Sequence, residues 1–322
     1  MTLAALLLAL TLQEAGHAVF RGTAMGSDLE IEVFGPDQAV CDRSVAEARA
    51  EIDRLDRMMT DWKAESPLMD INRAAGERPV PTTPELFFLI ERSLRMSELT
   101  EGAFDITFAG AGKLWNWRAK DPQVPDAAAV KASLATVGWR GVTLDPKERS
   151  VFLTKPGMRI GLGAIAPGYA GDRAIEKIRA LGIRDACVNV SGDLMAIGKK
   201  DGEPWKIGIT HPRKKGEMLA VLPVSNAAVS TSGDYERYFE KDGRRYCHII
   251  DPRTGVPADR CQSVTIVAPN VAFADALATG VFVLGPEKGM ALVEKLEGVH
   301  ALVVAADGTV SLSPGLRKEK AR

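Results

Sequence analysis

Asp275 and Thr279 lie four residues apart in the segment F-A-D-A-L-A-T-G-V-F-V-L-G, whose apolar composition indicates a helix. Residues at positions i and i+4 project from one face of a helix, so the carboxylate and the hydroxyl are expected side by side. Oxygen ligands of this kind suit a hard cation such as Mg²⁺. The alternative is a capping aspartate and a threonine whose hydroxyl bonds back to a helical carbonyl.

His248 stands in the string R-R-Y-C-H-I-I-D-P-R-T-G, on an expected strand that is followed by a turn. An imidazole can accept a proton from an attacking hydroxyl near neutral pH, which makes His248 a candidate general base. The alternative is a strand histidine with its hydrogen bonds satisfied, followed by an ordinary D-P-R-T-G turn.

Three glycine-containing strings could bind phosphate or sugar, or could simply form turns. They are N-V-S-G-D-L at 189–194, S-T-S-G-D-Y at 230–235 and I-G-L-G-A-I-A-P-G-Y at 160–169. The chain contains no G-x-G-x-x-G, Walker A, H-E-x-x-H or G-x-S-x-G string. The common dinucleotide, nucleoside triphosphate, zinc protease and hydrolase motifs are therefore missing.

The elements that position these residues follow from the hydrophobic periodicity. Apolar residues at spacings of three and four predict helices over residues 39–59, 83–99, 168–181, 271–284 and 286–296. Alternating or short apolar runs predict strands at 29–34, 141–144, 151–153, 158–160, 186–190, 205–209, 218–224, 227–231, 246–250, 263–268 and 301–305. The strands come in runs, which favours an α+β fold with antiparallel sheets over a doubly wound nucleotide-binding fold.

Composition narrows the class of partner. The 322 residues carry a formal charge of −1, with 46% hydrophobic and 26% charged residues, so no strong field favours nucleic acid. The four cysteines form no C-x-x-C pair, which argues against a thiolate zinc site. Small molecules and proteins are the expected partners.

An apolar run from Leu3 to Leu12, followed by Ala15, Gly16 and Ala18, predicts a signal peptide over residues 1–18 and an exported, periplasmic or cell-envelope protein. The alternative is a buried N-terminal helix in a cytoplasmic protein. No later stretch reaches the roughly 18 apolar residues of a membrane span, so none is expected in the mature chain. Residues 19–314 are expected to form one domain, and 315–322 a frayed basic tail.

Taken together, the strings resemble the ApbE-type FAD:protein FMN transferases, from T-A-M-G-S near residue 23 to about residue 308. The most specific strings are S-T-S-G-D-Y-E-R, H-I-I-D-P-R-T-G and A-D-A-L-A-T, supported by T-E-G-A-F-D-I-T and V-S-G-D-L. The resemblance implies an α+β body with T-fold-like antiparallel sheets. It also implies a Mg²⁺-dependent enzyme that cleaves FAD and attaches FMN, through a phosphoester, to a Thr or Ser hydroxyl of an acceptor protein, releasing AMP. The acceptor motif would be of the D-G-x-S/T-G-A-S/T type.

Residue by residue, the resemblance implies three metal contacts: the side chains of Asp275 and Thr279 and the backbone carbonyl of Ala164. His248 would be the catalytic base and would also contact the flavin nucleotide. The other implied flavin-nucleotide contacts are Met25, Trp62 (where the family usually has tyrosine), Ala103, Phe104, Asp105, Gly161, Pro167, Ser232 and Gly233.

The glycine-rich loop departs from the family pattern D-L-G-G-I-A-K-G-Y-A. Gly161 and Pro167 stand where an aspartate and a lysine usually contact the flavin nucleotide. This removes a positive charge, a polar contact and a backbone N–H. The alternative function is therefore a homologue that binds or hydrolyses FAD with weak or no transfer.

Overall fold

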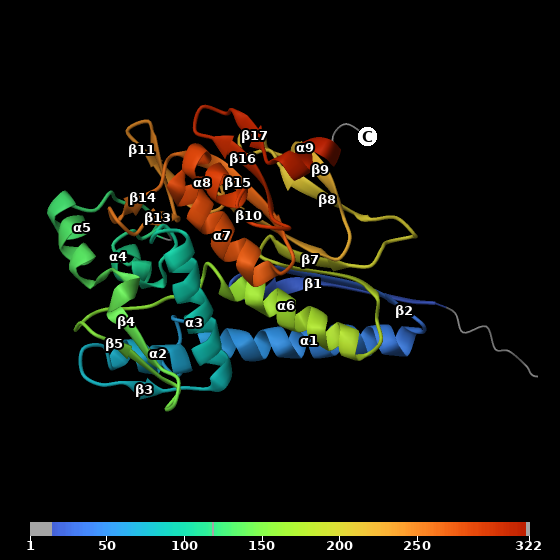
Figure 1. The fold of residues 1–322 in the computed structure, drawn as a ribbon, viewed down its shortest axis with the longest axis horizontal. Helices are drawn as coiled ribbons and strands as arrows, with labels where there is room; N and C mark the ends of the chain where they lie inside the picture. Colours follow the sequence, from blue (N-terminus) through green and yellow to red (C-terminus); the bar gives the residue numbers. More distant parts are fainter. Residues whose placement is uncertain (1–14, 118, 320–322) are drawn as a thin grey trace, which may run out of the picture.

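The computed structural model describes residues 15–117 and 119–319. Its main element is an antiparallel eight-stranded sheet in the order β1-β2-β6-β7-β10-β15-β16-β17 (Figure 1). The strands are β1 Gly16–Ala24, β2 Ser27–Gly35, β6 Asp185–Val190, β7 Asp193–Ile197, β10 Ala227–Gly233, β15 Cys261–Ala268, β16 His300–Ala305 and β17 Val310–Leu312. The expected α+β class with antiparallel strands is confirmed.

Alternation along the strands divides the apolar side chains between two cores, one on each face of the sheet. In β16, Ala301 and Val303 join the larger core, whereas Leu302 and Val304 join the smaller one. The same alternation in β7 sends Met195 to the larger core. The sheet is thus covered on both faces, which explains why the residues of a strand such as β7 are nearly all apolar.

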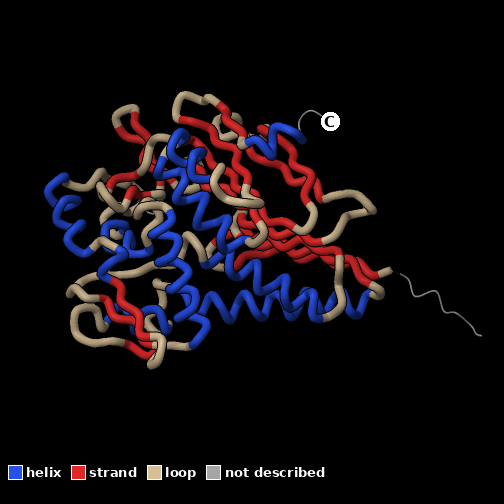
Figure 2. The backbone as a smooth tube through the Cα atoms, in the orientation of Figure 1, coloured by secondary structure: helices blue, strands red, loops and turns tan. Residues whose placement is uncertain are grey.

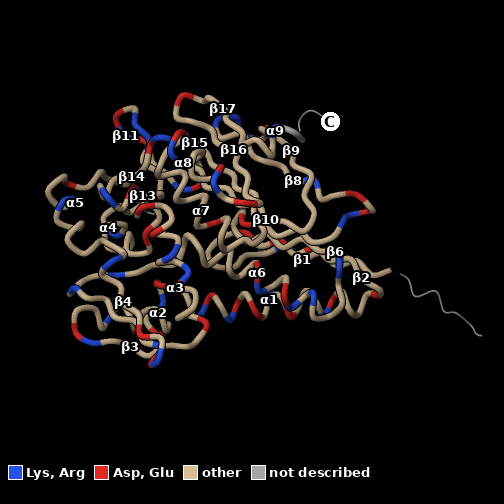
Figure 3. Tube along the Cα trace, viewed as in Figure 1, with Lys and Arg blue, Asp and Glu red and all other residues tan. Residues whose placement is uncertain are grey.

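Helices cover the face of the larger core. α1 (Gln38–Met59), α6 (Ala166–Ala180) and α7 (Val271–Leu284) pack against one another and against the sheet (Figures 1 and 2). Acidic and basic residues alternate along α1, as expected for a helix with one face in water (Figure 3). On the other face, the smaller core includes residues of the hairpin formed by β8 (Trp205–Thr210) and β9 (Met218–Val224).

Smaller elements complete the described chain. The remaining helices are α2 Pro67–Arg73, α3 Pro84–Leu99, α4 Ala109–Gly112, α5 Ala127–Ser133, α8 Pro286–Val293 and α9 Pro314–Glu319, with 3₁₀ turns at Ile106–Phe108, Leu134–Thr136 and Trp139–Gly141. The remaining strands are β3 Val80–Pro81, β4 Val142–Asp145, β5 Ser150–Leu153, β11 Tyr238–Lys241, β12 Arg244–Cys247, β13 Ile250–Asp251 and β14 Val256–Pro257. The four cysteines are free thiols.

Three expected elements differ from the structure. Residues 158–160 are not a strand, because the side chain of Asn72 bonds both the N–H and the carbonyl of Ile160 at 2.8 and 2.9 Å and takes the place of a strand partner. The strand expected over 246–250 is interrupted at His248, between β12 and β13. Helix α8 ends at Val293, short of residue 296.

The ends of the described chain are ordered elements of the fold. β1 begins at Gly16, so a cut after Ala15 leaves it whole, whereas a cut after Ala18 removes its first three residues. Residues 1–14 of the expected leader lie outside the described residues. The tail expected to fray from residue 315 instead contributes to α9, where Leu316 is buried in the smaller core. Among the described helices, none combines the length and apolarity that a membrane crossing requires.

The N-terminal ends of α6 and α7 meet closely. A Cβ atom on Gly168 would lie 2.6 Å from the carbonyl oxygen of Val271, so only glycine allows this approach. One turn later, the carboxylate of Asp172 accepts hydrogen bonds from the N–H groups of Val271 and Ala272 at 2.8 and 3.0 Å. Asp172 therefore satisfies the first N–H groups of α7 from outside that helix.

We expect Asp172→Ala to lower the free energy of unfolding by about 2 kcal/mol, because two N–H groups of α7 lose their acceptor. Urea unfolding followed by circular dichroism measures the change. Asp126→Ala is the matched control, since Asp126 caps the short, exposed helix α5 in the same way. A loss no greater than that of the control contradicts this role of Asp172.

Candidate active site

Asp275 and Thr279 lie one turn apart on α7, as expected from their spacing. The carboxylate of Asp275 accepts a hydrogen bond from the N–H of Gly168 at 3.2 Å. The hydroxyl of Thr279 lies 3.3 Å from that of Ser232 on β10. Asn270 is the N-cap of α7, with its side chain bonded to Phe273, which rules out the capping alternative for Asp275.

A second buried carboxylate, that of Asp193 on β7, raises the pKa of Asp275. Asp193 and Asp275 are 7% and 6% exposed, and Asp193 accepts a hydrogen bond from the hydroxyl of Ser230 at 2.5 Å. Burial raises the pKa of both, and the charge of Asp193 raises the pKa of Asp275 further. Among the described residues, no basic side chain lowers the pKa of Asp193 or of Asp275.

This pair fits a cation site. Two buried carboxyl groups without a basic partner destabilise each other when ionised, and a divalent cation would relieve that repulsion. Within the described part of the chain, no cluster of three His, Cys, Asp or Glu side chains could hold a metal. The predicted ligand set does not need such a cluster, because it combines one carboxylate with a hydroxyl and a backbone carbonyl.

The loop from Gly161 to Gly168 lies against Asp275. The N–H groups of Ile165 and Ala166 both donate to the carbonyl of Leu162, which closes the tight turn that contains Ala164. Through the bond from Gly168, this turn is fastened to the aspartate of α7. The structure therefore brings the end of the segment that contains Ala164 to Asp275.

Pro167 lies in the first turn of α6 and is buried. Proline is well tolerated there, because N–H groups of the first turn have no partner within the helix. Replacing a lysine by Pro167 therefore leaves α6 intact while it removes a side-chain charge from the loop.

The loop that holds Ala103, Phe104 and Asp105 is rigid and largely buried. The carboxylate of Asp105 accepts hydrogen bonds from the N–H and hydroxyl of Thr107 and the N–H of Trp139, at 2.7–2.8 Å. Burial raises the pKa of Asp105 despite these bonds. The side chain of Asp105 thus holds the loop together, and a ligand contact here would come mainly from the backbone.

His248 is partly buried between β12 and β13, where its backbone N–H donates to the carbonyl of Arg237 at 2.9 Å. Among the described residues, its Nδ1 atom has no hydrogen-bond partner. Burial, followed by the charge of Arg237, lowers the pKa of His248 to about 4. The imidazole is therefore neutral at pH 7. The alternative of a satisfied strand histidine is wrong, because His248 lies between two strands and its Nδ1 atom has no partner among the described residues.

Arg237 links the turn that contains Met25 to His248. Met25 has a φ of 52° in the turn between β1 and β2, and the guanidinium of Arg237 donates to the carbonyl of the next residue, Gly26, at 3.4 Å. Trp62 lies in the loop after α1, and its side chain is 78% exposed. Its predicted stacking on a flavin stays a prediction.

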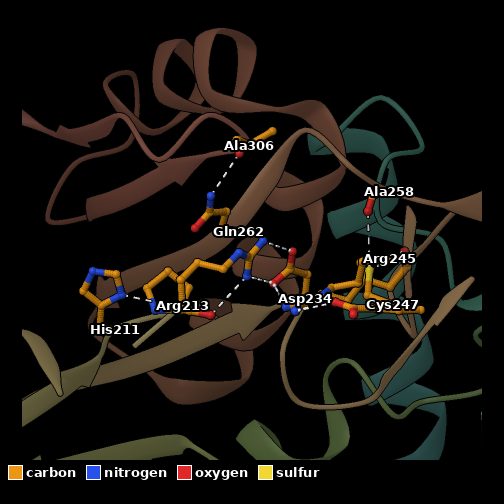
Figure 4. Close-up of polar contacts among 11 residues, drawn as sticks. His211, Arg213, Asp234, Arg245, Cys247, Ala258, Gln262 and Ala306 are labelled. Atoms are coloured by element: carbon orange, nitrogen blue, oxygen red, sulfur yellow. Dashed lines mark hydrogen bonds and ion pairs between the residues drawn. The ribbon is translucent and has the colours of Figure 1, made fainter. Parts of the chain in front are cut away.

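Asp234 anchors the segment that carries Ser232 and Gly233, and the sequence reading did not single it out. Its carboxylate accepts two hydrogen bonds from Arg213, at 2.7 and 2.6 Å, and a longer one from Arg245 at 3.4 Å (Figure 4). The contact with Arg245 joins the end of β10 to β12, the strand that leads to His248.

Asp193 was also missed as an individual residue, although the string V-S-G-D-L contains it. In both V-S-G-D-L and S-T-S-G-D-Y the aspartate directly follows a glycine. That repeated glycine–aspartate pair was the available signal, but only the pairing of β7 with β10 shows that Asp193 belongs to the site.

Comparisons with known proteins identify the family of this chain. The model of the ApbE family matches residues 25–303. A FAD:protein FMN transferase of Klebsiella pneumoniae is 36% identical over 91% of each chain, and one of Treponema pallidum is 37% identical over 85% of this chain and 82% of its own. The crystal structure of the ApbE protein of Thermotoga maritima has a TM-score of 0.87 at 32% identity, covering 94% of this chain and 98% of its own. The flavinyl transferase ApbE of Pseudomonas stutzeri, in its apo form, has a TM-score of 0.83 at 30% identity, with 94% and 96% covered. This chain is a member of the ApbE family.

Proposed function

We propose that this chain is a Mg²⁺-dependent FAD:protein FMN transferase, which moves FMN from FAD to a Ser or Thr hydroxyl of an acceptor protein and releases AMP. The relatives that carry this name match most of both chains. The observation that carries the proposal is the buried carboxylate of Asp275, fastened to the Gly161–Gly168 loop and lying one helical turn from Thr279. On the basis of the apolar leader we also propose that the chain acts outside the cytoplasm.

Asp275, Thr279 and the carbonyl of Ala164 would hold the metal ion. When bound, Mg²⁺ supplies positive charge that neutralises the phosphate oxygens as the diphosphate breaks. The chain's own contribution is to fix these oxygen ligands: Gly168 holds Asp275, and Ser232 lies beside Thr279.

His248 would accept the proton of the incoming hydroxyl. Because its pKa is lowered to about 4, the ring is neutral and has a nitrogen lone pair at physiological pH. The acceptor oxygen forms the new bond to the FMN phosphorus while the bond from that phosphorus to the bridging oxygen breaks. AMP departs with the bridging oxygen, and the hydroxyl proton passes to the imidazole.

The second candidate function is FAD binding or hydrolysis with little transfer. It is favoured by Gly161 and Pro167, which provide neither the carboxylate nor the positive charge that the family usually places in this loop. The two candidates differ in the fate of FMN, which either becomes covalently attached to protein or stays free.

Incubation with FAD, Mg²⁺ and an acceptor protein that carries the D-G-x-S/T-G-A-S/T motif is expected to yield a fluorescent acceptor band on a denaturing gel. The acceptor with its last Ser or Thr changed to Ala is the control. Binding of FAD without any labelled band, or release of free FMN alone, contradicts the transferase proposal and supports the second candidate.

Asp275→Ala is expected to reduce Mg²⁺-dependent transfer at least about 100-fold, because the metal loses its one carboxylate ligand. Without metal the variant should be at least as stable as the wild type, since the repulsion with Asp193 is gone. Differential scanning calorimetry with and without Mg²⁺ separates the two effects. Wild-type transfer, or a Tm of the variant that still rises with Mg²⁺, places the metal elsewhere.

His248→Asn is expected to slow transfer by about 10²–10⁴-fold, the usual contribution of a general base, while FAD still binds. In the free wild-type protein, the imidazole NMR signal of His248 should titrate near pH 4. Because the unfolded chain binds this proton more readily, stability should fall from about pH 6.5 towards pH 4, and less steeply in the variant. A midpoint near 6.5 contradicts the burial of a neutral ring.

A further inference from the structure

The carboxylate of Asp61 lies beside the backbone of Gly161. A Cβ atom built on Gly161 would be 3.6 Å from Oδ2 of Asp61, 3.1 Å from Cβ of Ala109 and 3.9 Å from the ring of Phe108. The space into which a side chain at position 161 would extend is therefore bordered by a carboxylate from a distant part of the chain.

Asp61 is held in this place by Arg159. A guanidinium nitrogen of Arg159 donates to the carbonyl of Asp61 at 2.7 Å and lies 3.7 Å from its Oδ2. Asn72 fixes the next residue of that segment, Ile160, through two backbone hydrogen bonds. The side chain of Asp61 is nevertheless 25% exposed, so its carboxylate is positioned and still accessible to a ligand.

The surroundings of Asp61 are the segments that the family resemblance associates with the flavin nucleotide. Trp62 follows it directly and exposes its ring. The N–H of Gly161 donates to the carbonyl of Ile106 at 2.8 Å, which joins the glycine loop to the segment just after Ala103–Asp105. Because the carboxylate of Asp105 is already bonded to Thr107 and Trp139, Asp61 provides a more accessible acidic group at this junction.

We propose that Asp61 binds the flavin nucleotide and supplies the carboxylate that position 161 lacks. The inference rests on the proposed function, since it concerns the FAD of that reaction. An ionised carboxylate only accepts hydrogen bonds and repels phosphate, so Asp61 contacts a donor group of FAD, a ring N–H, an amine or a hydroxyl, and not the diphosphate.

The geometry allows an exchange experiment. Gly161 is not among the described residues with positive φ, so a residue with a side chain can adopt its backbone conformation. Asp61→Gly combined with Gly161→Asp moves the carboxylate back to the glycine loop. Gly161→Asp alone places two carboxylates against each other and should not improve binding.

FAD affinity of the metal-free and Mg²⁺-loaded protein is measured by quenching of flavin fluorescence. Asp61→Ala should raise the Kd for FAD about 10-fold or more, the usual cost of a lost hydrogen bond to a charged group. The exchange variant should recover most of that loss. Asp42→Ala, which removes an exposed carboxylate from α1, is the matched control and should bind FAD as the wild type does.

An unchanged Kd for both Asp61→Ala and Asp61→Asn overturns the inference. So does a raised Kd that the exchange variant fails to reduce, because the loss would then come from the contact with Arg159. Circular dichroism and thermal unfolding of each variant exclude a folding defect as the cause. If the wild type binds FAD but labels no acceptor, the transferase proposal fails while the Kd values still decide the role of Asp61. If the wild type labels the acceptor and Asp61→Ala binds FAD normally, only the inference fails.

Discussion

The buried carboxylate of Asp275 is the group around which the site is built. Burying an acid is costly unless it is bonded or paired with a cation, and Asp275 has one backbone donor, Gly168, while the charges of Asp193 and Asp172 raise its pKa. Asp275 lies where α6, α7 and the centre of the sheet meet. A bound cation would offset that cost, which supports the proposal of a metal site at Asp275.

The contacts between the N-terminal ends of α6 and α7 also position the helices around the site. Gly168 brings the start of α6 against the start of α7, Asp172 satisfies the first N–H groups of α7, and Gly168 also donates to Asp275. The positions of Asp275 and Thr279 are therefore set by helix packing. Rigid elements of this kind hold ligands in place more accurately than loops do.

Local patterns in the sequence were enough for the parts of this arrangement that depend on neighbours in the chain. The spacing of Asp275 and Thr279 implied one helical face, and the apolar periods implied α1, α3 and α7. Contacts between distant segments were out of reach. Residues 158–160 look like a strand by composition, yet Asn72, 88 residues away, takes up the backbone groups of Ile160. For the same reason the approach of Asp193 to Asp275, and of Asp61 to Gly161, could not be foreseen.

The two departures in the glycine loop have different physical consequences. At position 161 the lost side chain leaves room that Asp61 borders, so a carboxylate is still present near the loop. At position 167, proline fits the first turn of α6 and supplies no positive charge. Arg237 is the basic group beside His248, and it lowers the pKa of that ring while it bonds to Gly26. In the proposed reaction, neutralising the diphosphate of FAD would therefore fall mainly to the bound metal ion, because position 167 supplies no positive charge.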